Sequence, residues 1–152
     1  LVNEQQRGRM VEKITNAVGE LKGKTFAMLG LSFKPNTNDL RDAPALAIAQ
    51  ELMKQGATLR VYDPAALEEA CQIVSGLVPC KDAYEAAQGA DALILMTEWN
   101  QFRTLDFDRL KTALRQPIFF DLRNVYEPDR VATFGFHHIS VGRPNKTPSQ
   151  AK

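Results

Sequence analysis

One polar stretch of the sequence brings together an aromatic ring and two cations, in Phe33, Lys34 and Arg41. An aromatic face can stack on a base, and lysine and arginine side chains hold phosphate oxygens. The stretch runs into the expected first turn of a helix at Pro44, with Asp42 as the predicted N-cap. Because helix starts attract anions, a nucleotide is the favoured ligand. The alternative is that Phe33 packs inward and the two charges are merely solvated.

Three further residues stand where predicted strands end. Arg123 follows the apolar run 117–120, where its guanidinium can hold phosphate or ribose oxygens, or else pair with Asp121 or another acid. Asp63 closes another predicted strand, and an acid there can bind a ribose hydroxyl in dinucleotide-binding domains. Trp99 could stack on a ligand, although a lone tryptophan is more often a packing residue. These positions extend the candidate site beyond the first loop.

The sequence offers no residue set that could carry out catalysis at this site. It has no Ser/His/Asp set, no Cys/His pair in a ligand loop and no carboxylate pair with separate acid and base roles. Gly30 stands alone where the Rossmann fingerprint needs three glycines, so we do not expect NAD to bind this loop in the usual way. Adjacent His137 and His138 point to opposite faces of a strand and cannot share a metal. Cys71 and Cys80 form no CxxC pair, which argues against a disulfide or metal site.

The elements that must position these residues alternate between strand and helix. Continuous apolar runs indicate buried strands, and apolar residues at i, i+3, i+4 and i+7 indicate helix faces. The first helix is expected to stop at Gly23 and the second at Gly56. The predicted strands are 25–31, 58–62, 91–96, 117–120 and 136–141, the last at an edge, with a turn or short edge strand within 73–79. The predicted helices are 2–21, 44–55, 65–72, 82–88 and 107–114.

This order predicts a three-layer α/β/α Rossmann-like domain with a mostly parallel sheet, preceded by an N-terminal helix. Ligands of such sheets bind outside the carboxyl ends of the strands. The loops at 33–41, 63, 97–99 and 121–124 should therefore converge on one edge of the sheet. That edge is the predicted binding site.

Length and composition bound the fold and its partners. At 152 residues and 44% apolar content, the chain can build one domain with a sizeable core. A net charge of +1 gives no support to nucleic-acid or membrane-surface binding, and no apolar run approaches the roughly 20 residues of a spanning helix. The expected division is an N-terminal helix in 1–22, the α/β domain in 23–141 and a flexible tail in 142–152.

The first residue bears on the length of the parent protein, and the cysteines bear on its cellular compartment. The sequence begins with Leu1 in place of Met, so we expect a piece of a longer protein. Its N-terminus shows no signal-peptide layout. Only two cysteines are present, and reduced thiols in the cytoplasm are the expected state.

The run from Gly30 to Pro44, GLSFKPNTNDLRDAP, closely resembles the C-terminal domain of bacterial UDP-glucose 6-dehydrogenases. These enzymes form part of the UDP-glucose/GDP-mannose dehydrogenase family. The likeness continues through VYDP at 61–64, TEW at 97–99 and DLRN at 121–124, so it covers nearly the whole chain. GDP-mannose dehydrogenases are similar in the same domain, but Phe-Lys-Pro-Asn-Thr followed by Arg-Asp-Ala-Pro favours the UDP-glucose branch.

The resemblance implies an intact enzyme that oxidises the C6 hydroxyl of UDP-glucose twice, to UDP-glucuronate, with two NAD and a covalent intermediate on a cysteine. In the family that cysteine and the NAD-binding loop lie upstream, and neither cysteine of this chain stands in a matching motif. The chain itself is therefore expected to bind UDP without catalysing. Carried over by position, Phe33, Lys34 and Arg123 contact the UDP-sugar, and Arg41 reaches NAD across the domain cleft.

The same resemblance implies that the N-terminal helix connects to a central dimer-forming region, so the intact enzyme is expected to be a homodimer. Two alternatives stay open. The chain could be the C-terminal domain of a GDP-mannose 6-dehydrogenase, or a non-catalytic nucleotide-binding or assembly module whose long loop contacts a partner.

Overall fold

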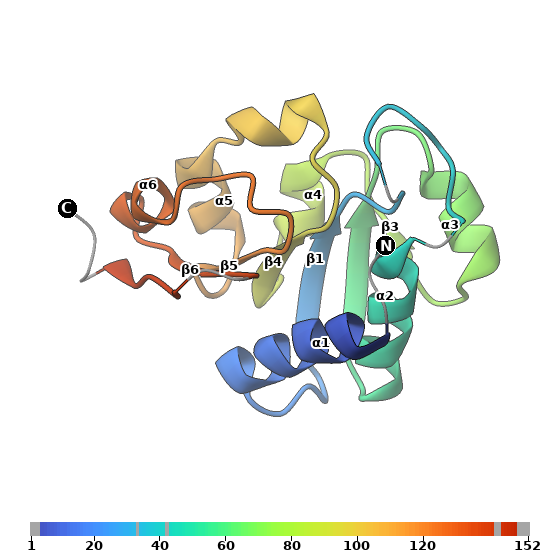
Figure 1. Cartoon of the computed structure of the whole chain (residues 1–152), viewed down its shortest axis with the longest axis horizontal. Helices are drawn as coiled ribbons and strands as arrows, with labels where there is room; N and C mark the ends of the chain where they lie inside the picture. Colours follow the sequence, from blue (N-terminus) through green and yellow to red (C-terminus); the bar gives the residue numbers. More distant parts are fainter. Residues whose placement is uncertain (1–3, 33, 42, 142–143, 149–152) are drawn as a thin grey trace.

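A computed structural model describes residues 4–32, 34–41, 43–141 and 144–148 of the chain. Helices and strands alternate along them (Figure 1). The elements are α1 (Glu4–Val18), β1 (Thr25–Leu29), α2 (Pro44–Lys54), β2 (Thr58–Tyr62), α3 (Leu67–Ile73), β3 (Val78–Pro79), α4 (Ala83–Ala87), β4 (Ala92–Leu95), the 3₁₀ helix η1 (Asn100–Thr104), α5 (Phe107–Ala113), β5 (Ile118–Asp121), α6 (Pro128–Thr133) and β6 (His137–Ser140).

The strands of the described residues form one sheet in the order β3-β2-β1-β4-β5-β6. Every neighbouring pair is parallel. The chain order reverses between β1 and β4, and in open parallel sheets the ligand crevice lies at such a reversal. The predicted Rossmann-like fold is confirmed, with a sheet that is parallel throughout.

Each strand alternates its side chains between two apolar cores. On one face, Phe26 and Met28 of β1 pack with Ile14 of α1 and residues of α2. On the other face, Leu93 of β4 packs with Phe107 of α5 and residues of α4 and α6. Figure 1 shows α1 and α2 on one side of the sheet and α4, α5 and α6 on the other. The domain therefore has three layers, as predicted.

One helix end and one helix cap differ from their predicted positions. Helix α1 ends at Val18 because Gly19 adopts a left-handed φ of 80°, ahead of the predicted stop at Gly23. Helix α2 begins at Pro44 with Ala43 as its N-cap. The predicted cap, Asp42, lies outside the described residues.

Helix α6 was not predicted and changes the topology after β5. In the predicted order the last two strands follow one another directly, whereas α6 lies between them and supplies the crossover that makes β6 parallel to β5. Its six residues bury only Val131 and Ala132, too few to show a helical period. Pro128 at its first turn was the available signal.

Both ends of the described chain contact the α/β layers. The Lys13 ammonium of α1 donates a hydrogen bond to the Ser140 carbonyl oxygen at 2.9 Å. Near the C-terminus, Lys146 and His138 exchange two backbone hydrogen bonds of 2.8 and 3.0 Å. The division into connecting helix, domain and flexible tail stays a prediction.

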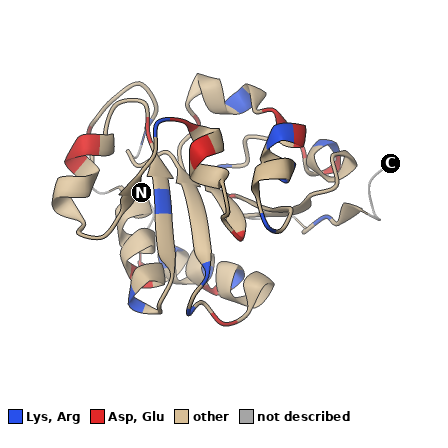
Figure 2. Cartoon of the chain, turned by 180° about the vertical axis from the view of Figure 1, so that it is seen from behind, with Lys and Arg blue, Asp and Glu red and all other residues tan. Residues whose placement is uncertain are grey.

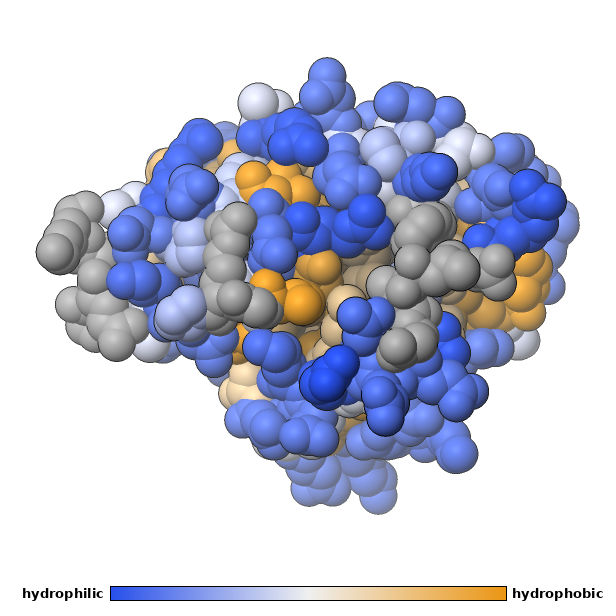
Figure 3. All heavy atoms as spheres, viewed as in Figure 1, coloured by the Kyte–Doolittle hydropathy of each residue, from blue (hydrophilic) through white to orange (hydrophobic). Residues whose placement is uncertain are grey.

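The surface carries charges of both signs. Basic and acidic residues are interspersed along the chain in Figure 2, and hydrophobic residues show as small areas among hydrophilic ones in Figure 3. Among the described residues, Ile73 is the large hydrophobic side chain most open to solvent, at 61% exposure. None of the described helices has the length and apolar character needed to cross a bilayer.

Candidate functional site

The strand register brings the predicted loops to one edge of the sheet. Leu29, the last residue of β1, pairs with Tyr62 at the end of β2 and with Leu95 at the end of β4. Leu95 in turn pairs with Asp121 at the end of β5. All four strands thus end at the same level, and the expected convergence of the loops that follow them is confirmed.

Gly30 makes the sharp exit of the chain from β1. Its φ is +89°, and its N–H donates to the Tyr62 carbonyl oxygen at 2.9 Å. A Cβ at this position would lie 2.5 Å from the Cβ of Thr97. The backbone conformation and the closeness of the loop after β4 therefore both require glycine.

Asp63 fastens the loop after β1 to the end of β2. Its side chain is 3% exposed, and its carboxylate accepts four backbone hydrogen bonds. The donors are Leu31 at 2.7 Å, Ser32 at 3.4 Å, and Ala65 and Ala66 at 2.8 Å each. Because both oxygens accept backbone hydrogen bonds, this geometry argues against a ribose contact through Asp63.

Lys34 lies on a backbone segment braced by the neighbouring loop. The Ser32 hydroxyl donates to the Lys34 carbonyl oxygen at 2.7 Å, and the Thr97 hydroxyl donates to the Ser32 carbonyl oxygen at 2.6 Å. Ser32 and Thr97 are buried, whereas Lys34 is exposed. The backbone at Lys34 is therefore held in place, while its side chain is open to solvent. Phe33, its predicted partner, lies outside the described residues.

Arg123 leaves from a turn built around the buried carboxylate of Asp121. That carboxylate accepts N–H groups of Arg123 at 3.3 Å, Val125 at 3.0 Å and Tyr126 at 2.7 Å. Burial by itself raises the pKa of Asp121, but the His138 imidazole and the backbone donors outweigh burial, so the pKa lies below its usual value. Asp121 is therefore a charged acceptor that fixes the turn.

The Arg123 guanidinium pairs with a carboxylate from the next loop. Its Nη2 lies 3.1 Å from the Glu98 carboxylate. About a quarter of each side chain is exposed, 23% and 24% respectively. The alternative of an ion pair with Asp121 or another acid thus applies to Arg123, and the acid is Glu98. The pair lies at the edge where the strands end and is partly accessible to solvent.

Arg41 occupies a different, open part of the long loop. Its side chain is 88% exposed and forms a two-point ion pair with Asp39, with Nε–Oδ1 and Nη2–Oδ2 distances of 3.0 and 2.8 Å. Hydrogen bonding to Arg41 lowers the pKa of Asp39 to about 2. The contact between Arg41 and NAD stays a prediction.

Comparison with known proteins gives this edge a family context. Residues 27–128 match the sequence model of the UDP-glucose/GDP-mannose dehydrogenase family, UDP binding domain. The chain belongs to this family. The match runs from β1 to the start of α6, so it includes the turns that carry Lys34 and Arg123.

Relatives of this UDP binding domain are longer than the chain. It is 48% identical over 145 residues to the UDP-glucose 6-dehydrogenase of Rhizobium meliloti (strain 1021), covering 95% of this chain and 33% of the relative. It is 40% identical over 143 residues to the UDP-glucose 6-dehydrogenase TuaD of Bacillus subtilis (strain 168), covering 93% and 31%. The chain thus spans about a third of the length of these curated relatives.

Two solved dehydrogenase structures share this fold. A UDP-glucose dehydrogenase of Pyrobaculum islandicum superposes with a TM-score of 0.69 at 29% identity, covering 78% of this chain and 26% of that one. An NDP-N-acetyl-D-galactosaminuronic acid dehydrogenase of Methanosarcina mazei Go1 gives 0.80 at 26% identity, covering 93% and 30%. The expected family membership and fold are confirmed.

The Trp99 side chain packs against one of the two apolar cores. Its ring is half-buried against the core on the α5 side of the sheet. Its Nε1 is buried without an acceptor among the described residues. Stacking on a ligand stays untested for this side chain.

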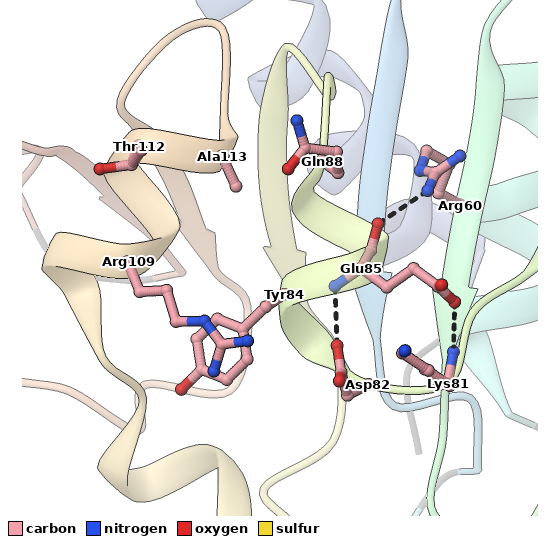
Figure 4. A pocket seen from close by; sticks show the side chains of 9 residues that line it. All are labelled: Arg60, Lys81, Asp82, Tyr84, Glu85, Gln88, Arg109, Thr112 and Ala113. Carbon is pink, nitrogen blue, oxygen red and sulfur yellow. Dashed lines mark hydrogen bonds between the residues drawn. The ribbon is translucent and has the colours of Figure 1, made fainter.

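A separate pocket of about 620 Å³ lies between α4, α5 and β2 (Figure 4). The Arg60 guanidinium there donates to the carbonyl oxygens of Glu85 and Ala86, and the Arg109 guanidinium stacks 4.0 Å above the Tyr84 ring. Both guanidinium groups are thus engaged with the protein. None of the predicted site residues lines this pocket.

The remaining candidate groups show no catalytic features. Burial raises the pKa of the Cys71 and Cys80 thiols, which lowers their nucleophilicity. His137 is exposed and His138 is buried, as expected for opposite faces of one strand. Within the described residues no group of three or more His, Cys, Asp or Glu side chains could hold a metal ion.

Proposed function

We propose that this chain is the UDP-sugar-binding domain of an NAD-dependent UDP-glucose 6-dehydrogenase. In that role it binds UDP-glucose and UDP-glucuronate, and the intact enzyme carries out the two-step oxidation. The observation that carries the proposal is the placement of Lys34 and Arg123 on turns at one edge of a domain that belongs to the UDP-binding family. Alone, the chain should bind without turnover.

The two cations suit different parts of a diphosphate. Lys34 is a flexible point charge open to solvent, and the guanidinium of Arg123 is a planar fork held on one side by Glu98. A guanidinium fork can donate to phosphate oxygens at two points, which a lysine ammonium cannot do. Phe33 is proposed as a further contact to the UDP-sugar.

NAD does not fit the first loop of this domain in the usual way. The N–H groups of Leu31 and Ser32, which a Rossmann loop would offer to a pyrophosphate, donate instead to Asp63. The space beside Gly30 is filled by Thr97. We therefore propose that NAD is bound mainly by an upstream domain, with Arg41 as a contact from this one.

Two further proposals concern the location and assembly of the intact enzyme. We place it in the cytoplasm as a homodimer, with α1 as the connection to the dimer-forming region. These assignments are independent of how the chain binds UDP.

Calorimetry tests the binding function directly. UDP titrated into the chain should release heat, and Arg123→Ala should abolish most of it. Arg115→Ala is the matched control, because Arg115 is exposed and lies just beyond α5. GDP binding that is tighter than UDP binding would favour the GDP-mannose branch of the family. Absence of heat with UDP, GDP and NAD would contradict the proposal and favour an assembly module.

A further inference from the structure

The turn that carries Arg123 depends on one buried group, the Asp121 carboxylate. Asp121 is fully buried and accepts the backbone N–H groups of Arg123, Val125 and Tyr126. These bonds fix the backbone from which the Arg123 side chain leaves. A group that holds the carboxylate in place therefore also acts on the direction of the Arg123 guanidinium.

His138 on β6 is placed to hold that carboxylate. In the β5–β6 register, Phe119 pairs with His138 and Asp121 with Ser140, so the side chains of all four lie on one face of the sheet. The imidazole Nε2 is 3.6 Å from Asp121 Oδ2, within ion-pair range but longer than a hydrogen bond. Both side chains are completely buried.

Packing alone does not explain a histidine at this position. Its ring meets the Phe119 ring edge-on at 5.8 Å, next to an aromatic layer that includes Phe107 and Phe136. Neither imidazole nitrogen has a hydrogen-bond partner among the described residues. Burying such unpaired polar atoms is unfavourable, and a phenylalanine would fit the same layer without that cost.

Other charged groups around β6 are engaged elsewhere. Lys146 pairs with His138 through the backbone only, and its ammonium lies 3.2 Å from Asp129. Arg130 of α6 lies over the Tyr126 ring, with 6.0 Å between the guanidinium carbon and the ring centroid. Among the described residues, Asp121 is therefore the acid within ion-pair distance of the imidazole.

We propose that His138 is a positioning residue for diphosphate binding: it supports the Asp121 carboxylate, and Asp121 places Arg123. The inference rests on the proposed function, in which Arg123 contacts the UDP-sugar. The imidazole touches no ligand itself. Its contribution is to limit the orientations of the carboxylate and, through the three backbone hydrogen bonds, those of the turn.

Three variants separate positioning from packing. His138→Phe keeps the ring volume but removes the polar contact with Asp121. His138→Gln restores a donor in place of Nε2. His137→Phe is the matched control, because the exposed neighbour points to the other face of β6. Each is measured for UDP affinity by calorimetry, for melting temperature, and for amide hydrogen exchange at Val125 and Tyr126.

His138→Phe should bind UDP about 3- to 10-fold more weakly, the range expected for loss of one modest polar interaction. Its melting temperature should equal or exceed that of the unmodified chain, while the Val125 and Tyr126 amides exchange faster. His138→Gln should recover most of the affinity, and His137→Phe should change neither quantity. A purely structural histidine would instead shift the melting temperature without this loss of affinity.

The inference and the proposed function fail in different ways. If the unmodified chain binds UDP but His138→Phe binds it equally well, the positioning role is overturned and the proposed function stands. If the unmodified chain does not bind UDP, the proposed function fails, and the amide exchange still decides whether His138 holds the turn. Unchanged exchange at Val125 and Tyr126 in His138→Phe would overturn that link.

Discussion

Replacing Asp63 by asparagine should lower the free energy of unfolding by about 2–4 kcal/mol, because the amide leaves two buried donors without an acceptor. Oδ2 of Asp63 accepts the N–H groups of Leu31 and Ser32, and Oδ1 accepts those of Ala65 and Ala66. Asparagine has one side-chain oxygen, so its NH₂ group must face one of these pairs. It should face the Leu31 and Ser32 pair, which contains the weak 3.4 Å contact.

Urea unfolding at neutral pH measures this loss. Asp82→Asn is the control, since Asp82 accepts a single N–H, from Glu85 at 2.7 Å, as the N-cap of α4. Asparagine caps helices as well as aspartate does, so the control should change stability by less than about 0.5 kcal/mol. A loss below about 1 kcal/mol in Asp63→Asn would refute the anchoring role and make the carboxylate a ribose ligand candidate again.

Three further predictions concern the same edge. Gly30→Ala should destabilise the chain by about 2–5 kcal/mol in thermal unfolding, because it combines left-handed backbone strain with overlap with Thr97. In Gly19→Ala the added Cβ has no atom within 4 Å, so only the backbone strain should lower the stability. The lowered pKa of Asp121 means that its contribution to stability is present above its unfolded value of 3.8 and is lost as pH falls through the lower folded pKa; urea unfolding from pH 5 downward should show this slope, and Asp121→Asn should flatten it. Lys34→Ala should weaken UDP binding by about 1.5–3 kcal/mol, as for a charge-assisted hydrogen bond, with an unchanged melting temperature; equal calorimetric affinities would contradict a phosphate contact.

Helices and strands were predictable where a short stretch of sequence carries a recognisable pattern. A continuous apolar run indicates β4, and Gly56 marks the end of α2, so both elements were predicted to within a few residues. Helix α6 has no such signature, because six residues make less than two turns and show no period. Its absence from the prediction left the last strand without a crossover.

The site was predictable only in outline. Parallel strands end at one edge, and that rule alone brought the loops after β1, β2, β4 and β5 together. The sequence could not show that Asp63 bonds to the backbone of a loop 32 residues away, or that Glu98 and Arg123 form a pair across 25 residues. Such contacts depend on the distance between two loops, and that distance is known only once the pairing of the strands is known.

The engagement of the acids at this edge is compatible with the proposed anion site in a chain whose net charge is only +1. Asp63 and Asp121 are buried and directed at backbone N–H groups, and Glu98 is paired with Arg123. Lys34 is exposed and forms no ion pair among the residues that the structure describes. The charge presented to a ligand is therefore set by which side chains are engaged within the protein and not by the overall composition. Because Lys34 follows β1 and Arg123 follows β5, with β4 between them, a ligand that contacts both must extend across β4. An extended, negatively charged group such as a nucleoside diphosphate meets that requirement.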